Sequence, residues 1–181
     1  MTLEEGMRKT YELLDEYTSG GEAAADEDIA ARLPDLFDIA QKRLARRARI
    51  VRLHSVERQP GVTEYPLPVP RLGICRVWRG ERPCRNYTVR GDSLVIPLGD
   101  GEDWTVEYFA LPATIDSSTP PAQALELCEA ACQCLPFFVA GMVLSSDLVQ
   151  DANIYLALYA QMVEELPETP PAAAGRVIRR V

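Results

Sequence analysis

The N-terminal segment has the apolar spacing of an amphipathic helix. Thr2-x-x-Glu5 is a capping box, in which a hydroxyl and a carboxylate satisfy free backbone amides at a helix start. Apolar residues then recur at helical spacing as far as Tyr17, and the sequence Thr-Ser-Gly-Gly over residues 18–21 breaks the pattern. The sequence therefore predicts a first helix whose apolar face carries Leu3, Met7, Leu14 and Tyr17.

A second helix is predicted after the acidic residues 26–28. At about 100° per residue, its apolar positions share one face: Ile29, Leu33, Leu36, Phe37, Ala40, Leu44, Ala48 and Val51. The face stays in register across Pro34, which predicts one kinked helix rather than two. Lys42, Arg46 and Arg49 lie opposite, and this basic face is either a solvated surface or an intermolecular one.

From about residue 50 the pattern changes to short runs rich in Val, Ile, Tyr and Trp, which are typical of strands. Gly91-Asp92 separates two of them and predicts a tight hairpin, and residues 99–102 predict the next turn. The predicted strands are Ile50–Val56, Leu72–Trp78, Arg85–Arg90, Leu94–Leu98 and Trp104–Leu111. This region is too long for an ordinary loop.

The helical pattern returns after Pro120-Pro121. Residues 122–144 are apolar on most sides, which predicts the most deeply buried helix, kinked at Pro136. A last helix is predicted between a cap at Ser145 or Ser146 and Pro167, with one apolar stripe: Leu148, Ala152, Tyr155, Tyr159, Val163 and Leu166. The chain ends in residues 176–181, whose alternation suits a strand added to another protein.

Together these patterns predict an α+β, mainly α fold. We expect a four-helix bundle with an antiparallel β-meander inserted between the second and third helices and an extended C-terminal arm. The expected domains are a helical bundle over residues 1–50 and 120–167, an inserted β subdomain over residues 51–119, and the arm over residues 168–181.

Composition limits the classes of function. The chain has 181 residues, of which 47% are hydrophobic and 25% charged, as in ordinary globular proteins. Its formal net charge of −8 argues against a nucleic-acid binder that relies on overall positive charge. The longest uncharged run, residues 130–146, is shorter than the ~20 apolar residues that span a bilayer. The start of the chain is acidic and has no apolar signal segment. We expect a soluble protein, cytoplasmic when made, with no membrane contact.

Candidate chemistry is sparse. The sequence has no glycine-rich phosphate loop, no HExxH and no nucleophile elbow. Cys128 and Cys132 share a predicted helix face, but Cys134 points elsewhere and the single histidine, His54, is distant in sequence. The thiols are therefore interpreted as small buried residues. We predict no catalytic residue, no metal and no cofactor, and an enzyme with an unrecognised site stays an alternative.

Four segments, in order along most of the chain, carry a family resemblance. They are Leu36-Phe-Asp-Ile-Ala-Gln-Lys-Arg-Leu-Ala-Arg46, Tyr65-Pro-Leu-Pro68, Tyr87-Thr-Val-Arg-Gly-Asp-Ser-Leu94 with Trp104-Thr-Val-Glu-Tyr-Phe-Ala-Leu-Pro112, and Leu135-Pro-Phe-Phe-Val-Ala-Gly-Met-Val-Leu-Ser-Ser-Asp147 with Tyr155 and Tyr159. With these segments and this element order, the chain resembles the head–tail connector (adaptor, head-completion) proteins of tailed bacteriophages and prophages. Its strand region resembles the subset with a fuller insertion.

The resemblance implies a structural, non-enzymatic protein at the head–tail junction of the virion, present in the bacterial host cytoplasm before assembly. Such proteins form a homo-oligomeric ring under the portal protein and extend the DNA exit channel. They meet a downstream tail or stopper protein, and packaged DNA passes without sequence-specific contact. A ring needs heterologous contacts that close by rotation. The expected interface residues are Lys42, Arg46, Arg49, Arg176, Val177, Ile178, Arg179 and Arg180. The acidic balance suits a wall along which DNA slides.

A second hypothesis is a nucleic-acid-binding module that uses the arginine-rich second helix and the β-meander. Aromatic residues interleave with arginines there, as on sheets that bind single strands: Trp78, Tyr87, Trp104, Tyr108 and Phe109. Because aromatic pairs also stabilise ordinary sheets, we favour a core role for these side chains.

Overall fold

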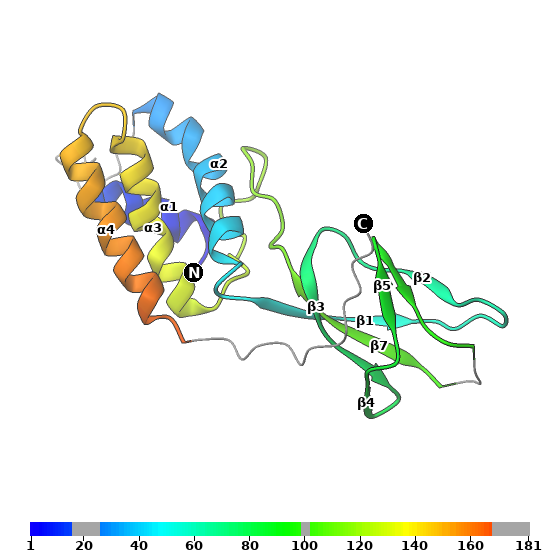
Figure 1. Ribbon diagram of the computed structural model, residues 1–181. Coiled ribbons are helices and arrows are strands. Elements are labelled where there is room, and N and C mark those ends of the chain that lie inside the picture. Colours follow the sequence, from blue (N-terminus) through cyan, green and yellow to red (C-terminus); the bar gives the residue numbers. More distant parts are fainter. Residues whose placement is uncertain (16–25, 99–101, 168–181) are drawn as a thin grey trace. The chain divides into compact units, whose positions relative to one another are not determined.

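The computed structural model describes residues 1–15, 26–98 and 102–167 (Figure 1). The elements follow in the order α1 (Leu3–Leu13), α2 (Glu27–Leu44), β1 (Ile50–Val56), β2 (Glu64–Pro66), β3 (Arg71–Arg79), β4 (Arg82–Cys84), β5 (Thr88–Arg90), β6 (Ser93–Val95), β7 (Trp104–Ala110), α3 (Glu129–Leu144) and α4 (Val149–Glu165). The described residues form two compact units: a helical unit of residues 1–15, 26–48 and 112–167, and a sheet unit of residues 49–98 and 102–111.

The predicted mainly α fold, a four-helix bundle with one inserted β-meander, is wrong. The seven strands before the last two helices form two antiparallel sheets, and the described residues are about 40% helical and about 24% strand. A meander pairs strands in sequence order, whereas the larger sheet has the order β1-β7-β3-β4 and the smaller sheet the order β2-β6-β5. Alternation in the sequence marks a strand but leaves its partner open, because partners are chosen by tertiary packing.

α3 is the centre of the helical unit. Ten of its sixteen residues are buried, and a helix that is apolar on all sides has to be covered all round. α1, α2 and α4 each pack against α3 and contact one another little (Figure 1). α2 continues through Pro34 as one helix, as predicted, and α3 continues through Pro136.

Two glycines allow the helices to approach closely. A Cβ atom at Gly141 of α3 would lie 2.7 Å from Leu156 Cγ and 3.2 Å from the carbonyl oxygen of Ala152, both on α4. A Cβ atom at Gly6 of α1 would lie 2.8 Å from a ring carbon of Phe37 on α2. The two carbon–carbon distances are shorter than normal carbon contacts, so a residue larger than glycine at either position would require its neighbour to shift.

The N-terminus explains why α3 begins later than predicted. Thr2 and Glu5 form the predicted capping box, but the backbone of residues 1–4 also bonds to residues 121–125. The amide of Leu3 donates to the Gln123 carbonyl at 2.9 Å, and the amide of Leu125 donates to the Met1 carbonyl at 3.0 Å. Residues 121–125 are therefore paired with the start of the chain, with a bridge between Thr2 and Ala124, and the expected helix starts only at Glu129.

Other helix boundaries also differ from expectation. α2 ends at Leu44, so Ala48 and Val51 of the predicted apolar face lie outside it. α4 follows Leu148, whose side chain provides no cap, so neither predicted serine caps this helix. Leu148 is 53% exposed, although the predicted stripe placed it in the core. The α4 residues that are buried are Ala152 and Tyr159.

The sheet unit has its own hydrophobic core between the two sheets. β1 has the predicted bounds, and Gly91, with φ 57°, forms the predicted hairpin between β5 and β6. β2 and β4 were not predicted, and part of the predicted turn at 99–102 lies outside the described residues. The core consists of Val56, Tyr65, Leu67, Val77, Tyr87, Leu94, Ile96, Trp104, Val106, Tyr108 and Ala110.

We expect Gly141→Ala to destabilise the chain, although alanine normally favours a helix interior over glycine by about 1 kcal/mol. The added methyl group meets Leu156, and overpacking of this kind costs about 1–3 kcal/mol. Urea unfolding followed by circular dichroism measures the effect. In the double variant Gly141→Ala/Leu156→Ala the loss should be smaller than the sum of the two single losses. Additive losses would show that α3 and α4 do not meet at this glycine.

Candidate interaction surfaces

The predicted interface residue Lys42 is bonded within the chain. Its Nζ donates to Asp38 Oδ2 at 2.7 Å and to Thr114 Oγ1 at 3.0 Å, while Asp38 Oδ1 accepts from the amide of Ile115 at 3.0 Å. The buried side chain of Gln41 donates to the Ala113 carbonyl at 2.7 Å. Three neighbouring side chains of α2 therefore hold residues 113–115 along the helix, and Lys42 has a structural role.

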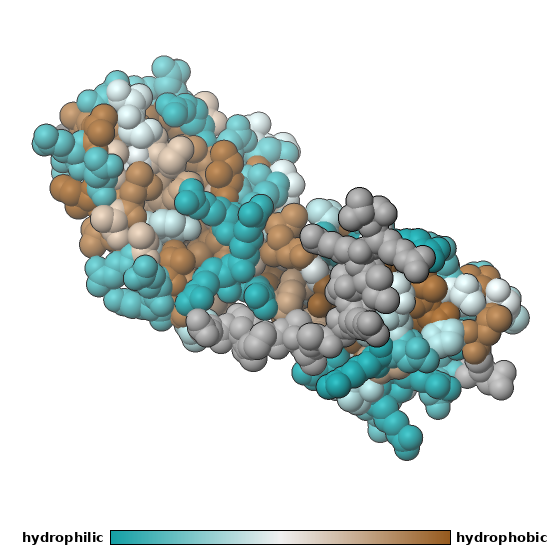
Figure 2. All heavy atoms as spheres, in the orientation of Figure 1, coloured by the Kyte–Doolittle hydropathy of each residue, from teal (hydrophilic) through white to brown (hydrophobic). Residues whose placement is uncertain are grey.

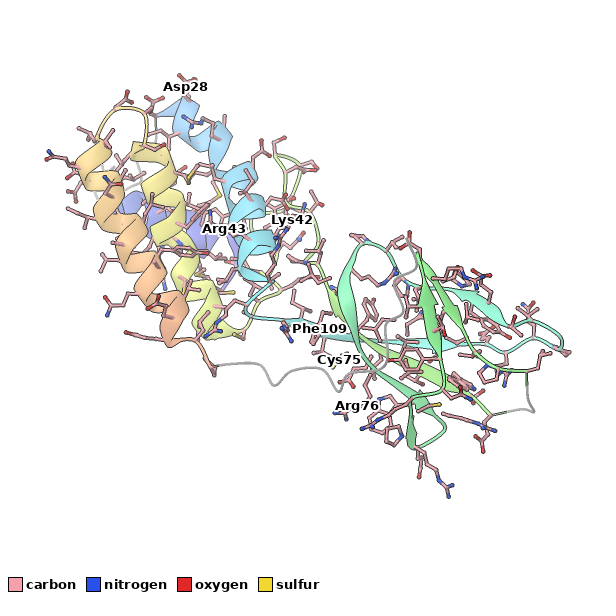
Figure 3. All side chains as sticks on the ribbon, in the orientation of Figure 1. Asp28, Lys42, Arg43, Cys75, Arg76 and Phe109 are labelled. Carbon is pink, nitrogen blue, oxygen red and sulfur yellow. The ribbon has the colours of Figure 1, made fainter. Side chains whose placement is uncertain are left out.

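The other predicted basic residues lie in different parts of the chain. Arg46 is exposed in the turn that follows α2. Arg49 belongs to the sheet unit, where its guanidinium lies 4.7 Å from the centre of the Phe109 ring. Arg43, which the sequence did not single out, extends from α2 towards α3 and lies 5.4 Å from the Phe138 ring centre (Figure 3). Arg176, Val177, Ile178, Arg179 and Arg180 lie outside the described residues.

The outer face of the larger sheet combines arginines with aromatic rings. The strand register places Val51, Leu53, Phe109 and Glu107 on this face, opposite to the core side. Arg49 covers Phe109, and Arg76 lies 5.1 Å from the ring centre of Trp78 on β3; Phe109 and Arg76 are labelled in Figure 3. Leu53 is 70% exposed. This face is an exposed surface of mixed apolar and basic character.

Most of the aromatic residues weighed for nucleic-acid binding are core residues. Tyr87, Trp104 and Tyr108 lie in the core between the sheets, which confirms the role favoured for them from the sequence. Phe109 is buried beneath Arg49, and only Trp78 is half-buried. The Nε1 atom of Trp104 is buried without a hydrogen-bond partner among the described residues.

The three clustered cysteines do not form a metal site. Cys132 and Cys134 are buried in α3, as expected, and their thiols contact the carbonyl oxygens of Leu127 and Ala130. Cys128 is exposed at the N-cap of α3, contrary to expectation. Burial raises the pKa of Cys132 to about 11, so its thiol stays protonated at neutral pH. Within the described ranges, no group of three His, Cys, Asp or Glu residues could hold a metal ion.

Charge is segregated between the two units. The described residues of the helical unit carry sixteen carboxylate side chains and seven bases, whereas those of the sheet unit carry seven carboxylates and nine arginines. From Pro112 to Pro167 the sequence has no lysine or arginine at all. The bases of the helical unit therefore lie on α1, on α2 and in the turn after α2, while α3 and α4 offer only carboxylates. The absence of lysine and arginine from Pro112 to Pro167 could have predicted this uneven distribution of charge from the sequence.

No model of a known protein family matches the chain, and no curated protein matches it. Among the helices of the described residues, none is both long enough and apolar enough to cross a membrane.

We expect Lys42→Ala to lower the free energy of unfolding by about 1 kcal/mol, because it removes the bonds to Asp38 and Thr114. Arg46→Ala is the matched control, since it removes an exposed base nearby and should change stability by less than about 0.5 kcal/mol. Urea denaturation of both variants measures the difference. Equal effects would contradict a structural role for Lys42.

Thiol labelling should separate the cysteines of the helical unit. With a pKa of about 11, only about one Cys132 thiol in a thousand is ionised at pH 8, whereas Cys128 is exposed. Iodoacetamide at pH 8, followed by peptide mass spectrometry, should modify Cys128 first and Cys132 only after unfolding in urea. The urea-unfolded chain is the control, and labelling of native Cys132 as fast as Cys128 would refute the burial.

Proposed function

We propose that the chain is a head–tail adaptor of a tailed bacteriophage or prophage. In this role it docks as a ring under the portal protein, extends the DNA exit channel and meets a downstream tail or stopper protein. The observation that carries the proposal is the element order: two helices, a separate strand region that returns beside its own start, two further helices and a terminal segment. The four sequence segments follow one another in this order, and the resemblance to adaptors rests on that order.

The segments that carry the resemblance contain residues that pack inside the two units, and this supports the proposal. Tyr65 is 6% exposed, and its hydroxyl donates to the Val62 carbonyl at 3.0 Å and accepts from the Gln59 amide at 3.1 Å. The Tyr65 hydroxyl therefore holds the backbone of the loop before β2. Phe138 of α3 packs against Tyr159 of α4 with ring centres 5.2 Å apart. Packed residues of this kind determine the fold. A resemblance based on their order along the chain is therefore stronger support for a shared fold than one based on surface residues.

The charge distribution also suits the proposed role. An adaptor channel has to let DNA pass, and carboxylates along its wall repel phosphates rather than bind them. The helical unit has a large excess of carboxylates, and its last two helices carry no base. We infer that the helical unit supplies an acidic surface to the DNA channel.

A second candidate is a nucleic-acid-binding module, and one observation favours it. The outer face of the larger sheet carries Arg49 and Arg76 stacked on aromatic rings, beside exposed apolar residues. Arginine and aromatic surfaces of this kind bind single-stranded nucleic acid. Against it, three of the five aromatic residues lie inside the core and offer no ring to a base.

Assembly with the portal tests the proposal. The purified chain, mixed with the portal protein encoded in the same genome, should add a ring of density to one end of portal particles in negative-stain electron microscopy. Bare portals at a high excess of the chain would refute the adaptor role. The second candidate instead requires the chain to shift single-stranded oligonucleotides at low salt and to release them as salt rises.

A further inference from the structure

α4 exposes an apolar stripe that the helical unit leaves uncovered. Of the ten large hydrophobic residues that are exposed in the described chain, three lie on α4 and one precedes it: Leu148, Val149, Ile154 and Leu158. Figure 2 shows apolar side chains reaching the surface over α4. Ile154 and Leu158 are one helical turn apart and so share a face, with exposed fractions of 57% and 41%.

The stripe on α4 has an acid at each end. Asp151 lies seven residues before Leu158 and Glu165 seven residues after it, and both carboxylates are exposed. Residues seven apart on a helix lie on nearly the same side, about 10.5 Å from one another. We call Asp151, Ile154, Leu158 and Glu165 the acidic stripe.

α2 carries the complementary arrangement. Its exposed large hydrophobic residue is Ile39, at 52%, and the exposed base Arg32 lies seven residues before it. The exposed base Arg46 lies seven residues after Ile39, in the turn that follows α2. We call Arg32, Ile39 and Arg46 the basic stripe. Both stripes have a hydrophobic residue in the middle and a charge seven residues away on each side, but the charges are opposite in sign.

The two stripes can be engaged at the same time. α2 and α4 lie on either side of α3, and neither stripe contains a residue that is buried in the helical unit (Figure 1). A copy of the chain can therefore present its acidic stripe to one neighbour and its basic stripe to another. Contacts between two different patches are heterologous, and they generate a ring when the rotation between copies closes.

We propose that the acidic stripe on α4 binds the basic stripe on α2 of a second copy of this chain. Leu158 packs on Ile39, and the carboxylates of Asp151 and Glu165 pair with the guanidinium groups of Arg32 and Arg46. In both stripes the two charges lie seven residues on either side of the central hydrophobic residue, so the three contacts follow in the same order along the two segments. This deepens the proposed function and rests on it in one respect, since an adaptor ring requires such a repeating contact.

Two variants, each with one stripe disabled, test the proposal in sedimentation velocity without any portal. The wild-type chain should form oligomers that grow with concentration. Arg32→Glu/Arg46→Glu makes the basic stripe acidic, and Ile154→Ser/Leu158→Ser removes the apolar part of the acidic stripe. Each variant alone should associate at least about tenfold more weakly than the wild type. An equal mixture should form a dimer and nothing larger, because only one intact pair of stripes is available.

Matched controls lie in the sheet unit. Val51→Ser/Leu53→Ser changes two exposed apolar residues of β1, and Arg82→Glu/Arg85→Glu reverses two exposed arginines. Both controls should associate as the wild type does. Circular dichroism checks that all variants fold.

Three results would overturn the proposal. One is a wild-type chain that stays monomeric up to about 1 mM, where even a weak specific contact is populated. Another is an unchanged association of Arg32→Glu/Arg46→Glu, which would indicate a symmetric contact between two α4 helices. The third is a mixture that forms no dimer. Because the portal is absent, these outcomes are separate from failure of the chain to decorate portals, which would refute the adaptor role alone.

Discussion

A helix that is apolar on every side, as α3 is, has to be covered by partners in all directions, and the chain supplies those partners from segments far apart in sequence. α1 and α2 come before the strands, and α4 comes after α3. The first residues of the chain also pair with residues 121–125, directly before α3. Covering α3 thus brings both helical segments into one unit and requires the intervening strands to leave and return. Gly141 allows α4 to lie close to α3, and Gly6 allows α1 to lie close to Phe37 of α2.

The same constraint decides where functional chemistry is placed. α3 uses its side chains for packing, so its cysteines are buried and protonated rather than reactive. Chemistry is left to the outer faces of the surrounding helices and to the outer face of the larger sheet. These faces carry arginines, carboxylates and exposed hydrophobic residues. The charge asymmetry of the helical unit follows the same division, because α2 carries bases whereas α4 carries only carboxylates.

Periodicity predicted the elements whose pattern is local and long. The capping box of α1, the passage of α2 through Pro34, the bounds of β1 and the hairpin at Gly91 all follow from neighbouring residues. The start of α3 could not be predicted, because residues 121–125 pair with the chain's first residues, more than a hundred positions away. For the same reason, the position of β7 between β1 and β3 could not be predicted from the alternation of apolar and polar residues in these strands. In the candidate surface, Lys42 pairs with Asp38, four residues before it on α2, and with Thr114. The contact with Thr114 depends on the tertiary fold and could not be predicted from the sequence.

The pairing of β1 with β7 has a consequence for how this protein can change over time. Ile50 faces Ala110 across the ladder, so the segment between them starts and finishes at adjacent points. Recombination at these two neighbouring positions could exchange the whole segment as a cassette, without a new connection through the helices. Selection can then alter the sheets while the packing around α3 is inherited intact.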